Sequence, residues 1–172
     1  MTVPFIDLKK EAAHIKFDYL QVVSDVVDKG YFMLGEHVQM FEQKFAQRVG
    51  MKYCVGLSSG ADALYLALRV LDIGTGDEVI IQGNAYNASV TSILRVGATP
   101  VFVDVDVQTA RLIPELVKDA ISSRTKAIMP VHLYGQSNNM AAISLIASEH
   151  GLKVIEDCAQ AHDASWDGQH VG

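Results

Sequence analysis

Two carboxylates end an apolar run in the stretch VIEDCAQAHDA, which extends from Val154 to Ala164. The second carboxylate, Asp157, is followed by the small thiol Cys158 and, two residues later, by the amide Gln160. Neither of these neighbours can neutralise an acid, and an uncompensated carboxylate is costly to bury. Asp157 therefore either caps the segment that follows it or awaits a positive partner that the chain does not itself supply.

Small residues follow an earlier apolar run, in the order Ser58, Ser59, Gly60, Ala61 and Asp62. Small side chains let a ligand approach the backbone closely, and the first N–H groups of a helix have no partner within the helix. A phosphate would fit such a helix start. The alternative is that Ser59 merely caps the helix, and the motif alone leaves both interpretations open.

Aromatic and polar residues follow two other apolar runs. The run EVIIQ is followed by GNAYN, which contains Tyr86, and the run KAIMPV is followed by HLYGQ. A ring such as that of Tyr86 either packs in the core or offers a face on which a flat ligand stacks.

Motifs for other nucleotide or metal chemistry are incomplete. VFVDVD resembles the acidic strand end of a nucleotide hydrolase, but no GxxxxGK[ST] motif occurs, so we interpret Asp104 and Asp106 as structural. The six histidines form no HExxH motif and no pair at helical spacing. We therefore predict no metal site.

The elements that would position these residues alternate between strands and helices. Apolar runs predict strands at residues 53–57, 78–82, 99–105, 126–131 and 152–156. Helical spacing predicts helices at about 14–29, 38–50, 58–71, 88–96, 113–121 and 140–147. This alternation predicts an α/β fold of three αβα layers with a mostly parallel sheet. Ligands bind such sheets beyond the carboxyl ends of the strands, where the candidate segments lie.

Composition and charge narrow the class of protein. A chain of 172 residues that is 49% hydrophobic can bury one core, as a single domain does. The net charge of -6, with Lys9 and Lys10 as the only adjacent basic pair, argues against a nucleic-acid or membrane partner. Cys54 and Cys158 form no CxxC motif, and no apolar run is long enough to cross a bilayer. We therefore expect a cytoplasmic protein.

Five segments in a fixed order resemble one family. They are YFMLGEHVQMFEQKFAQRVG, SSGADAL, GATPVFVDVD, MPVHLYGQ and VIEDCAQAHDA, and the similarity extends from about Val3 to Gly172. The pattern is similar to the nucleotide-sugar aminotransferases of the DegT/DnrJ/EryC1/StrS group, which have PLP-dependent transferase fold type I and use pyridoxal 5'-phosphate. The resemblance implies that residues 1–172 are the N-terminal portion of an incomplete cofactor-binding large domain, and that the C-terminal small domain is absent from this chain.

The resemblance also implies roles for individual residues. Asp157 matches the acid that pairs with the protonated pyridine nitrogen of the cofactor, and a carboxylate there keeps that nitrogen protonated so that the ring acts as an electron sink. Tyr86 matches the aromatic residue that stacks on the ring, and Gln160 matches the residue that binds the phenolic oxygen. The N–H groups that bind the phosphate match those of Gly60, Ala61 and Asp62.

The sequence departs from the family pattern at three places. Family members often have Thr in place of Ala61, which leaves only backbone contacts there, and usually have Gly in place of Asp163. None of the nine lysines matches the catalytic lysine that forms the Schiff base, and Lys153, the one nearest Asp157, belongs to the preceding strand. We therefore expect a fragment that lacks this lysine and is inactive alone.

The function implied by the resemblance is amino transfer to a keto-deoxysugar nucleotide, with glutamate as the amino donor and a homodimer as the complete assembly. HLYGQ favours the 3-keto over the 4-keto position. Such enzymes supply deoxyamino sugars for polysaccharides and antibiotics. Two alternatives stay open: a related PLP-dependent sugar dehydratase, in which His replaces the lysine, and a non-catalytic truncated product.

Overall fold

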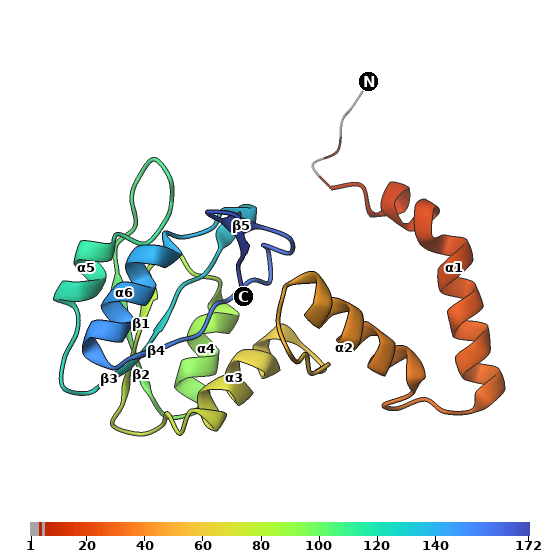
Figure 1. The fold of residues 1–172 in the computed structure, drawn as a ribbon, viewed down its shortest axis with the longest axis horizontal. Helices are drawn as coiled ribbons and strands as arrows, with labels where there is room; N and C mark the ends of the chain where they lie inside the picture. Colours follow the sequence, from red (N-terminus) through yellow and green to blue (C-terminus); the bar gives the residue numbers. More distant parts are fainter. Residues whose placement is uncertain (1–3, 5) are drawn as a thin grey trace.

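A four-stranded parallel sheet forms the centre of the molecule. The computed structural model describes Pro4 and residues 6–172. The strands lie in the order β2 (Thr99–Val103), β1 (Glu78–Gln82), β3 (Thr125–Met129) and β4 (Lys153–Val154), and all are parallel. Ile80 in β1 lies opposite Val101 on one side and Ile128 on the other. This arrangement, drawn in Figure 1, confirms the predicted parallel sheet.

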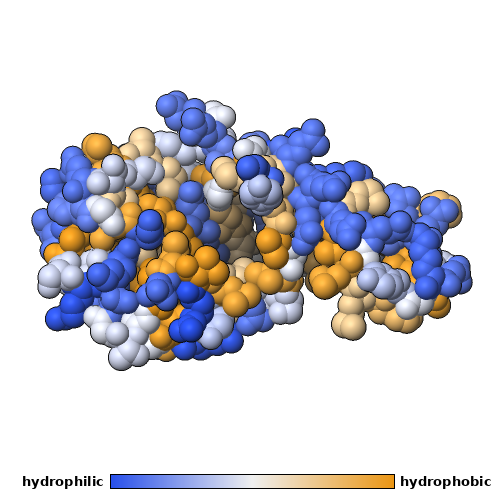
Figure 2. Space-filling model, turned by 60° about the horizontal axis from the view of Figure 1, so that its bottom comes forward, coloured by the Kyte–Doolittle hydropathy of each residue, from blue (hydrophilic) through white to orange (hydrophobic). Residues whose placement is uncertain are grey.

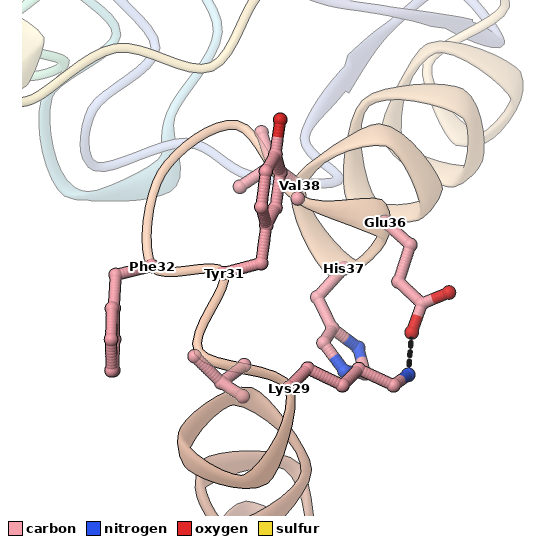
Figure 3. Close-up of a pocket in the computed structure, with 8 residues that line it drawn as sticks. Lys29, Tyr31, Phe32, Glu36, His37 and Val38 are labelled. Atoms are coloured by element: carbon pink, nitrogen blue, oxygen red, sulfur yellow. Dashed lines mark hydrogen bonds and ion pairs between the residues drawn. The ribbon is translucent and has the colours of Figure 1, made fainter.

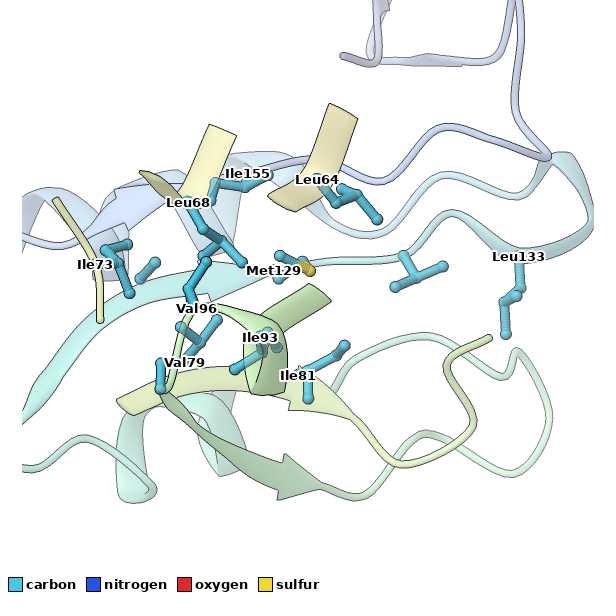
Figure 4. Packing of buried hydrophobic residues seen from close by; sticks show 13 residues of the cluster. Leu64, Leu68, Ile73, Val79, Ile81, Ile93, Val96, Met129, Leu133 and Ile155 are labelled. Carbon is cyan, nitrogen blue, oxygen red and sulfur yellow. The ribbon is translucent and has the colours of Figure 1, made fainter. Parts of the chain in front are cut away.

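One face of the sheet is covered by α3 (Gly60–Val70) and α4 (Asn87–Arg95). Leu68 of α3 and Ile93 of α4 belong to one buried cluster with Ile81 of β1, and all three side chains are fully buried. Figure 4 shows this cluster at the sheet. Burial of each side chain of this size stabilises the fold by about 1.5–3 kcal/mol, so the helices are held firmly against the strands.

The opposite face is covered by α5 (Pro114–Asp119) and α6 (Met140–His150). Val117 of α5 and Ile143 of α6 pack with Ile80 of β1 in a second buried cluster. Side chains alternate along a strand, so Ile80 faces this layer while the adjacent Ile81 faces the other. A strand that is buried on both faces needs apolar side chains on both, which explains the unbroken apolar run from Val79 to Ile81 in the middle of EVIIQ. The three-layer αβα prediction is confirmed.

Two N-terminal helices form an arm beside this body. α1 (Leu8–Lys29) and α2 (Glu36–Arg48) extend away from the sheet (Figure 1). Asp7 caps α1 by accepting a hydrogen bond from the Lys10 N–H at 3.0 Å, and Gly30 ends the helix with a left-handed φ of 65°. No residue of α1 is buried, and Figure 2 shows apolar side chains at the surface of both arm and body. None of the described helices is long and apolar enough to span a membrane.

The strand predicted at residues 53–57 is wrong. This segment pairs with no strand in the described part of the chain, and Tyr53 and Val55 are 74% and 72% exposed. An apolar run becomes a strand only where a neighbouring strand shares its backbone hydrogen bonds, and no such neighbour lies beside it here. Composition alone therefore mispredicts this segment.

The strand predicted at residues 152–156 is shorter than expected. Only Lys153 and Val154 form β4, because the strand lies at the edge of the sheet and pairs regularly with β3 over two residues. Two further hydrogen bonds continue the contact irregularly, from the Ile155 N–H to the Ile128 carbonyl at 3.0 Å and from the Asp157 N–H to the Pro130 carbonyl at 2.9 Å. The chain thus stays against β3 as far as Asp157.

A hairpin and a short 3-10 turn are absent from the sequence-based expectations. β5 (Ser165–Trp166) and β6 (Gln169–His170) pair antiparallel, and η1 (Leu133–Gly135) follows β3. Asp167 and Gly168 join the two hairpin strands with φ values of 50° and 80°. An Asp-Gly pair with positive φ at both residues is typical of a type I′ hairpin turn. The dipeptide Asp167-Gly168 could therefore have been used to predict the hairpin.

Candidate active site

Asp157 lies at the carboxyl edge of the sheet, just beyond β4. Both backbone polar groups of Asp157 form hydrogen bonds with the segment that follows β3. Its N–H donates to the Pro130 carbonyl, and its own carbonyl accepts from the His132 N–H at 3.0 Å. The residue is only 7% exposed, so the carboxylate is enclosed by protein. The sheet therefore fixes Asp157 where a ligand of an α/β fold is expected.

The carboxylate of Asp157 accepts two hydrogen bonds from neutral groups. The Ser89 hydroxyl donates to Oδ2 at 2.6 Å, and the Ala159 N–H donates to Oδ1 at 3.1 Å. Among the described residues, no Lys, Arg or His side chain forms an ion pair with it. The bond to Ala159 caps the following turn, but an ionised carboxylate has further acceptor positions. Its charge has no partner within the described chain.

A cavity of about 350 Å³ opens beside this carboxylate. Leu64, Val131 and Leu133 supply apolar walls. Five of the six predicted site residues line it, namely Gly60, Ala61, Tyr86, Asp157 and Gln160. Its volume and its few polar groups among apolar walls are typical of a site for a small cofactor.

The start of α3 offers two free N–H groups to this cavity. Ser59 is the N-cap, and its hydroxyl accepts from the Asp62 N–H at 3.1 Å. This bond uses the N–H of the third helical residue, and in the described part of the chain no acceptor binds the N–H of Gly60 or Ala61. A Cβ added at Gly60 would meet no atom within 4 Å, so the backbone is open to an incoming group. Capping and anion binding are therefore compatible.

The side chain of Asp62 does not line the cavity. It accepts hydrogen bonds from Ser58 at 2.8 Å and Ser59 at 3.0 Å, and it pairs with Arg95 at 3.1 Å. These partners, in that order, lower the pKa of the Asp62 carboxyl. The carboxylate is thus neutralised beside the helix start rather than repelling an anion there.

Tyr86 lies at the rim of the cavity. It is the N-cap residue of α4, where its backbone is extended, and it is 66% exposed. Because the ring is not part of either buried cluster, its position is compatible with stacking on a flat ligand and does not fit core packing.

Gln160 has one end of its amide fixed. Its Oε1 accepts from the Tyr134 N–H at 2.9 Å. The Nε2 group is consequently left to donate, as a phenolic oxygen would require.

A model of the DegT/DnrJ/EryC1/StrS aminotransferase family matches residues 13–172. The chain belongs to this family. It is 49% identical over 170 residues to the dTDP-3-amino-3,6-dideoxy-alpha-D-galactopyranose transaminase of Aneurinibacillus thermoaerophilus, covering 99% of this chain and 47% of that relative. The chain therefore spans less than half the length of this relative.

Solved structures of the family share the fold. DesV from S. venezuelae, in complex with a ketimine intermediate, matches with a TM-score of 0.97 and 43% identity, covering 99% of this chain and 46% of that chain. A GDP-4-keto-6-deoxymannose-3-dehydratase with a trapped PLP-glutamate geminal diamine matches with a TM-score of 0.83 and 30% identity, covering 89% and 41%. These matches confirm the predicted PLP-dependent transferase fold type I.

A buried polar network ties the strand ends of this family member together. Gln82, at the end of β1, accepts from the Val131 N–H at 3.0 Å, and Asn138 donates to the Val131 carbonyl at 2.9 Å. His132 Nδ1 accepts from the Asn138 N–H at 3.0 Å, and its Nε2 lies 3.0 Å from Glu156 Oε2. The network joins the ends of β1, β3 and β4, and so holds the chain that carries Asp157.

The Ser89 hydroxyl is a site group that was not predicted from the sequence. Ser89 is fully buried, as is Ser92 one turn later, on the side of α4 that faces the sheet with Ile93. Polar residues at helical spacing on an otherwise apolar stripe were the available signal. Their partners lie too far along the chain for the sequence to name.

Cys158 stands next to a group of potential metal ligands, with the ligand atoms of His132, Glu156 and Cys158 all within 4.8 Å of one another. Burial, together with the nearby charges of Glu156 and Asp157, raises the pKa of the Cys158 thiol to about 12. A metal needs the thiolate, and both ring nitrogens of His132 already have hydrogen-bond partners. These residues therefore act as a structural cluster.

A second cavity, of about 280 Å³, lies where α1 meets α2. Lys29 pairs with Glu36, as Figure 3 shows, and also with Asp25 at 2.9 Å. His37 Nε2 lies 2.8 Å from the same Asp25 carboxylate, and the hydrogen bonds from Lys29 and then His37 lower the pKa of Asp25. Lys29 occupies the centre of these acidic groups, so they form an ion-pair cluster of the arm.

Asp163, where the family resemblance predicts glycine, has a left-handed φ of 64°. Aspartate tolerates this conformation better than most residues. The Arg48 guanidinium donates to both of its carboxylate oxygens, at 2.7 and 3.1 Å. Asp163 therefore forms an ion pair that joins α2 to the loop.

Asp106 has the structural role predicted for it. Its side chain accepts from the Thr109 N–H at 2.7 Å and hydroxyl at 2.8 Å and from the Gln108 N–H at 3.1 Å. These bonds close the turn after β2.

Proposed function

We propose that the complete protein is a pyridoxal 5'-phosphate-dependent aminotransferase that acts on the ketone of a nucleotide-linked deoxysugar. The observation that carries this proposal is the convergence of a buried, unpaired carboxylate, an exposed ring, an amide donor and two free helix N–H groups on one cavity, in a member of this family. Each group matches a different part of the cofactor.

The cofactor, when bound, supplies an electron sink through which an amino group moves from an amino acid to a ketone. Asp157 holds the proton on the ring nitrogen, because an adjacent carboxylate favours the charged form of that nitrogen. Tyr86 provides the stacking face, and Gln160 Nε2 donates to the phenolic oxygen. The N–H groups of Gly60 and Ala61 bind the phosphate, whereas the Asp62 N–H stays with Ser59.

The 172 residues are proposed to be the N-terminal portion of the cofactor-binding large domain. No lysine lines the cavity in the described part of the chain, and the chain covers less than half of its relatives. The catalytic lysine and the C-terminal small domain would then belong to the rest of the protein.

The substrate is proposed to be a nucleotide-linked 3-keto sugar, with glutamate as donor and deoxyamino sugar biosynthesis as the setting. The name of the transaminase from Aneurinibacillus thermoaerophilus contains a 3-amino sugar, in agreement with the preference taken from HLYGQ. The dehydratase remains the second candidate, because one matched structure carries that name and contains glutamate bound to PLP.

A homodimer in the cytoplasm is the proposed state. α1 has no buried residue, and Ile15 and Tyr19 on it are 60% and 62% exposed, so a second copy could cover this face. Both cysteines are free, which suits a reducing compartment.

The test uses purified full-length protein with pyridoxal 5'-phosphate, glutamate and either a 3-keto or a 4-keto nucleotide sugar. Mass spectrometry should detect an amino sugar from the 3-keto substrate, and Asp157→Asn should lower turnover severely without loss of fold. A deoxygenated product without nitrogen would instead support the dehydratase. Near-normal turnover in Asp157→Asn would contradict the proposed role of Asp157 in holding the proton on the ring nitrogen.

A further inference from the structure

Ser89 reaches Asp157 across 68 positions of sequence. It lies in the first turn of α4, and its hydroxyl is 2.6 Å from Asp157 Oδ2. Both residues are buried, with Ser89 fully enclosed and Asp157 7% exposed. An ionised carboxylate only accepts hydrogen bonds, so the Ser89 hydroxyl is the donor. A short bond between a hydroxyl and a charged oxygen is among the stronger hydrogen bonds in proteins.

The neighbouring serine of α4 makes a different bond. Ser92 is equally buried, but its hydroxyl donates to the Ser89 carbonyl at 2.6 Å, within its own helix. This local bond is the usual solution for a serine inside a helix. The hydroxyl of Ser89 instead points out of the helix to a group at the edge of the sheet. Burial in α4 alone therefore does not explain the Ser89 contact.

The two donors to Asp157 fix its carboxylate without neutralising it. Ser89 holds Oδ2 and the Ala159 N–H holds Oδ1, so the plane of the carboxylate cannot rotate freely. The Asp157 carboxylate lines the cavity and can accept further hydrogen bonds there. No cationic side chain of the described chain pairs with it.

We propose that Ser89 is a positioning residue that orients the Asp157 carboxylate toward the ring nitrogen of the cofactor, so that this nitrogen holds its proton. This inference rests on the proposed function, in which Asp157 pairs with that nitrogen. Without the Ser89 hydroxyl, the carboxylate is freer to turn away from the ring nitrogen. The ring nitrogen is then less often protonated.

The experiment reads the ring nitrogen directly in full-length protein that is loaded with pyridoxamine 5'-phosphate enriched in ¹⁵N at that atom. The ¹⁵N resonance of the wild-type complex should lie at the protonated position, and that of Asp157→Asn at the unprotonated position. Ser89→Ala should move the resonance toward the Asp157→Asn position and weaken binding about tenfold. Ser89→Thr, which keeps a hydroxyl, should restore the wild-type resonance.

Two variants make the result decisive. Ser92→Ala removes an equally buried hydroxyl from the same helix, and it should leave the resonance unchanged. Ser89→Cys fills the site with a weak donor, and it should shift the resonance even if Ser89→Ala does not fold. A wild-type resonance in folded Ser89→Ala or Ser89→Cys would overturn the positioning role alone. Identical resonances in wild type and Asp157→Asn would overturn the proposed role of Asp157.

Discussion

The Tyr134 N–H donates to Gln160 Oε1 at 2.9 Å, beside the cavity that Gln160 lines. Tyr134 itself has a left-handed φ of 58°, so the chain turns sharply at the residue whose N–H makes this bond. An amide held by its oxygen presents its nitrogen on the other side. The contact therefore selects Gln160 as a donor to any ligand in the cavity.

The first prediction tests this donor with Gln160→Glu. The variant keeps an oxygen for Tyr134 but replaces Nε2 by a charged acceptor, which cannot donate to a phenolic oxygen. Affinity of the full-length protein for pyridoxamine 5'-phosphate should fall about tenfold or more, as measured by absorbance titration.

Gln136→Glu is the matched control, because Gln136 is exposed, lies in the loop that carries Tyr134 and does not line the cavity. It makes the same change in net charge and should alter the affinity less than about twofold. An equal loss in both variants would show that charge, rather than the donated hydrogen bond, governs binding.

The second prediction concerns the exposed ring of Tyr86. Tyr86→Phe should keep the affinity for the cofactor, because the aromatic face is retained. Tyr86→Ala should weaken binding roughly 2- to 10-fold, the range expected for loss of one aromatic contact. If titration gave equal affinities for Tyr86→Ala and wild type, the ring would have no stacking role.

The central strands could be predicted because their burial on both faces requires apolar residues, which are visible in the sequence. EVIIQ is apolar at its three central residues, Val79 to Ile81, and β1 is buried along its whole length, between two strands and two helix layers. The run YCVGL has a similar composition, yet no strand lies beside it in the described chain. Its state depends on a neighbour, and the sequence of the run does not contain one.

The candidate site could be predicted in part for the same reason. Asp157 and Tyr86 follow apolar runs, so parallel strands bring both to one edge. The hydrogen bond from Ser89 to Asp157 depends on the orientation of α4 about its axis on the sheet. The free Nε2 of Gln160 depends on the loop that carries Tyr134, whose N–H binds the amide oxygen. Residue spacing can mark Ser89 as a buried polar residue, but it names neither Asp157 as its partner nor the contact between Tyr134 and Gln160.

The third prediction concerns Glu78 at the start of β1. Ser122 donates to its carboxylate at 2.5 Å and Arg124 Nε donates at 2.9 Å, and these partners lower the pKa of Glu78 from its ordinary value of 4.5. A lowered pKa in the folded state means that the ionised group stabilises the fold above pH 4.5. This contribution is lost as the pH falls from 4.5 through the lowered value.

Thermal unfolding of wild type and Glu78→Gln should therefore be compared from pH 7 downwards. The wild type should melt at a higher temperature near neutral pH, and the difference should shrink as the pH falls below 4.5. Ser122→Ala removes the main donor and should reduce this dependence on pH. A difference that is constant over the whole range would contradict the lowered pKa.

The last prediction separates backbone strain from ion pairing at Asp163. Asp163→Gly relieves the left-handed φ of 64° but removes the partner of Arg48, whereas Asp163→Ala removes the partner and keeps the strain. A left-handed conformation costs an L-residue such as alanine roughly 1–2 kcal/mol relative to glycine. The melting temperature should therefore be lower for Asp163→Ala than for Asp163→Gly. Arg48 and Asp163 have side chains that are 64% and 53% exposed, so salt should screen their pairing. Raising the salt concentration should therefore lower the melting temperature of the wild type relative to that of Asp163→Gly. Equal melting temperatures for the alanine and glycine variants would show that the loop relaxes when the ion pair is lost.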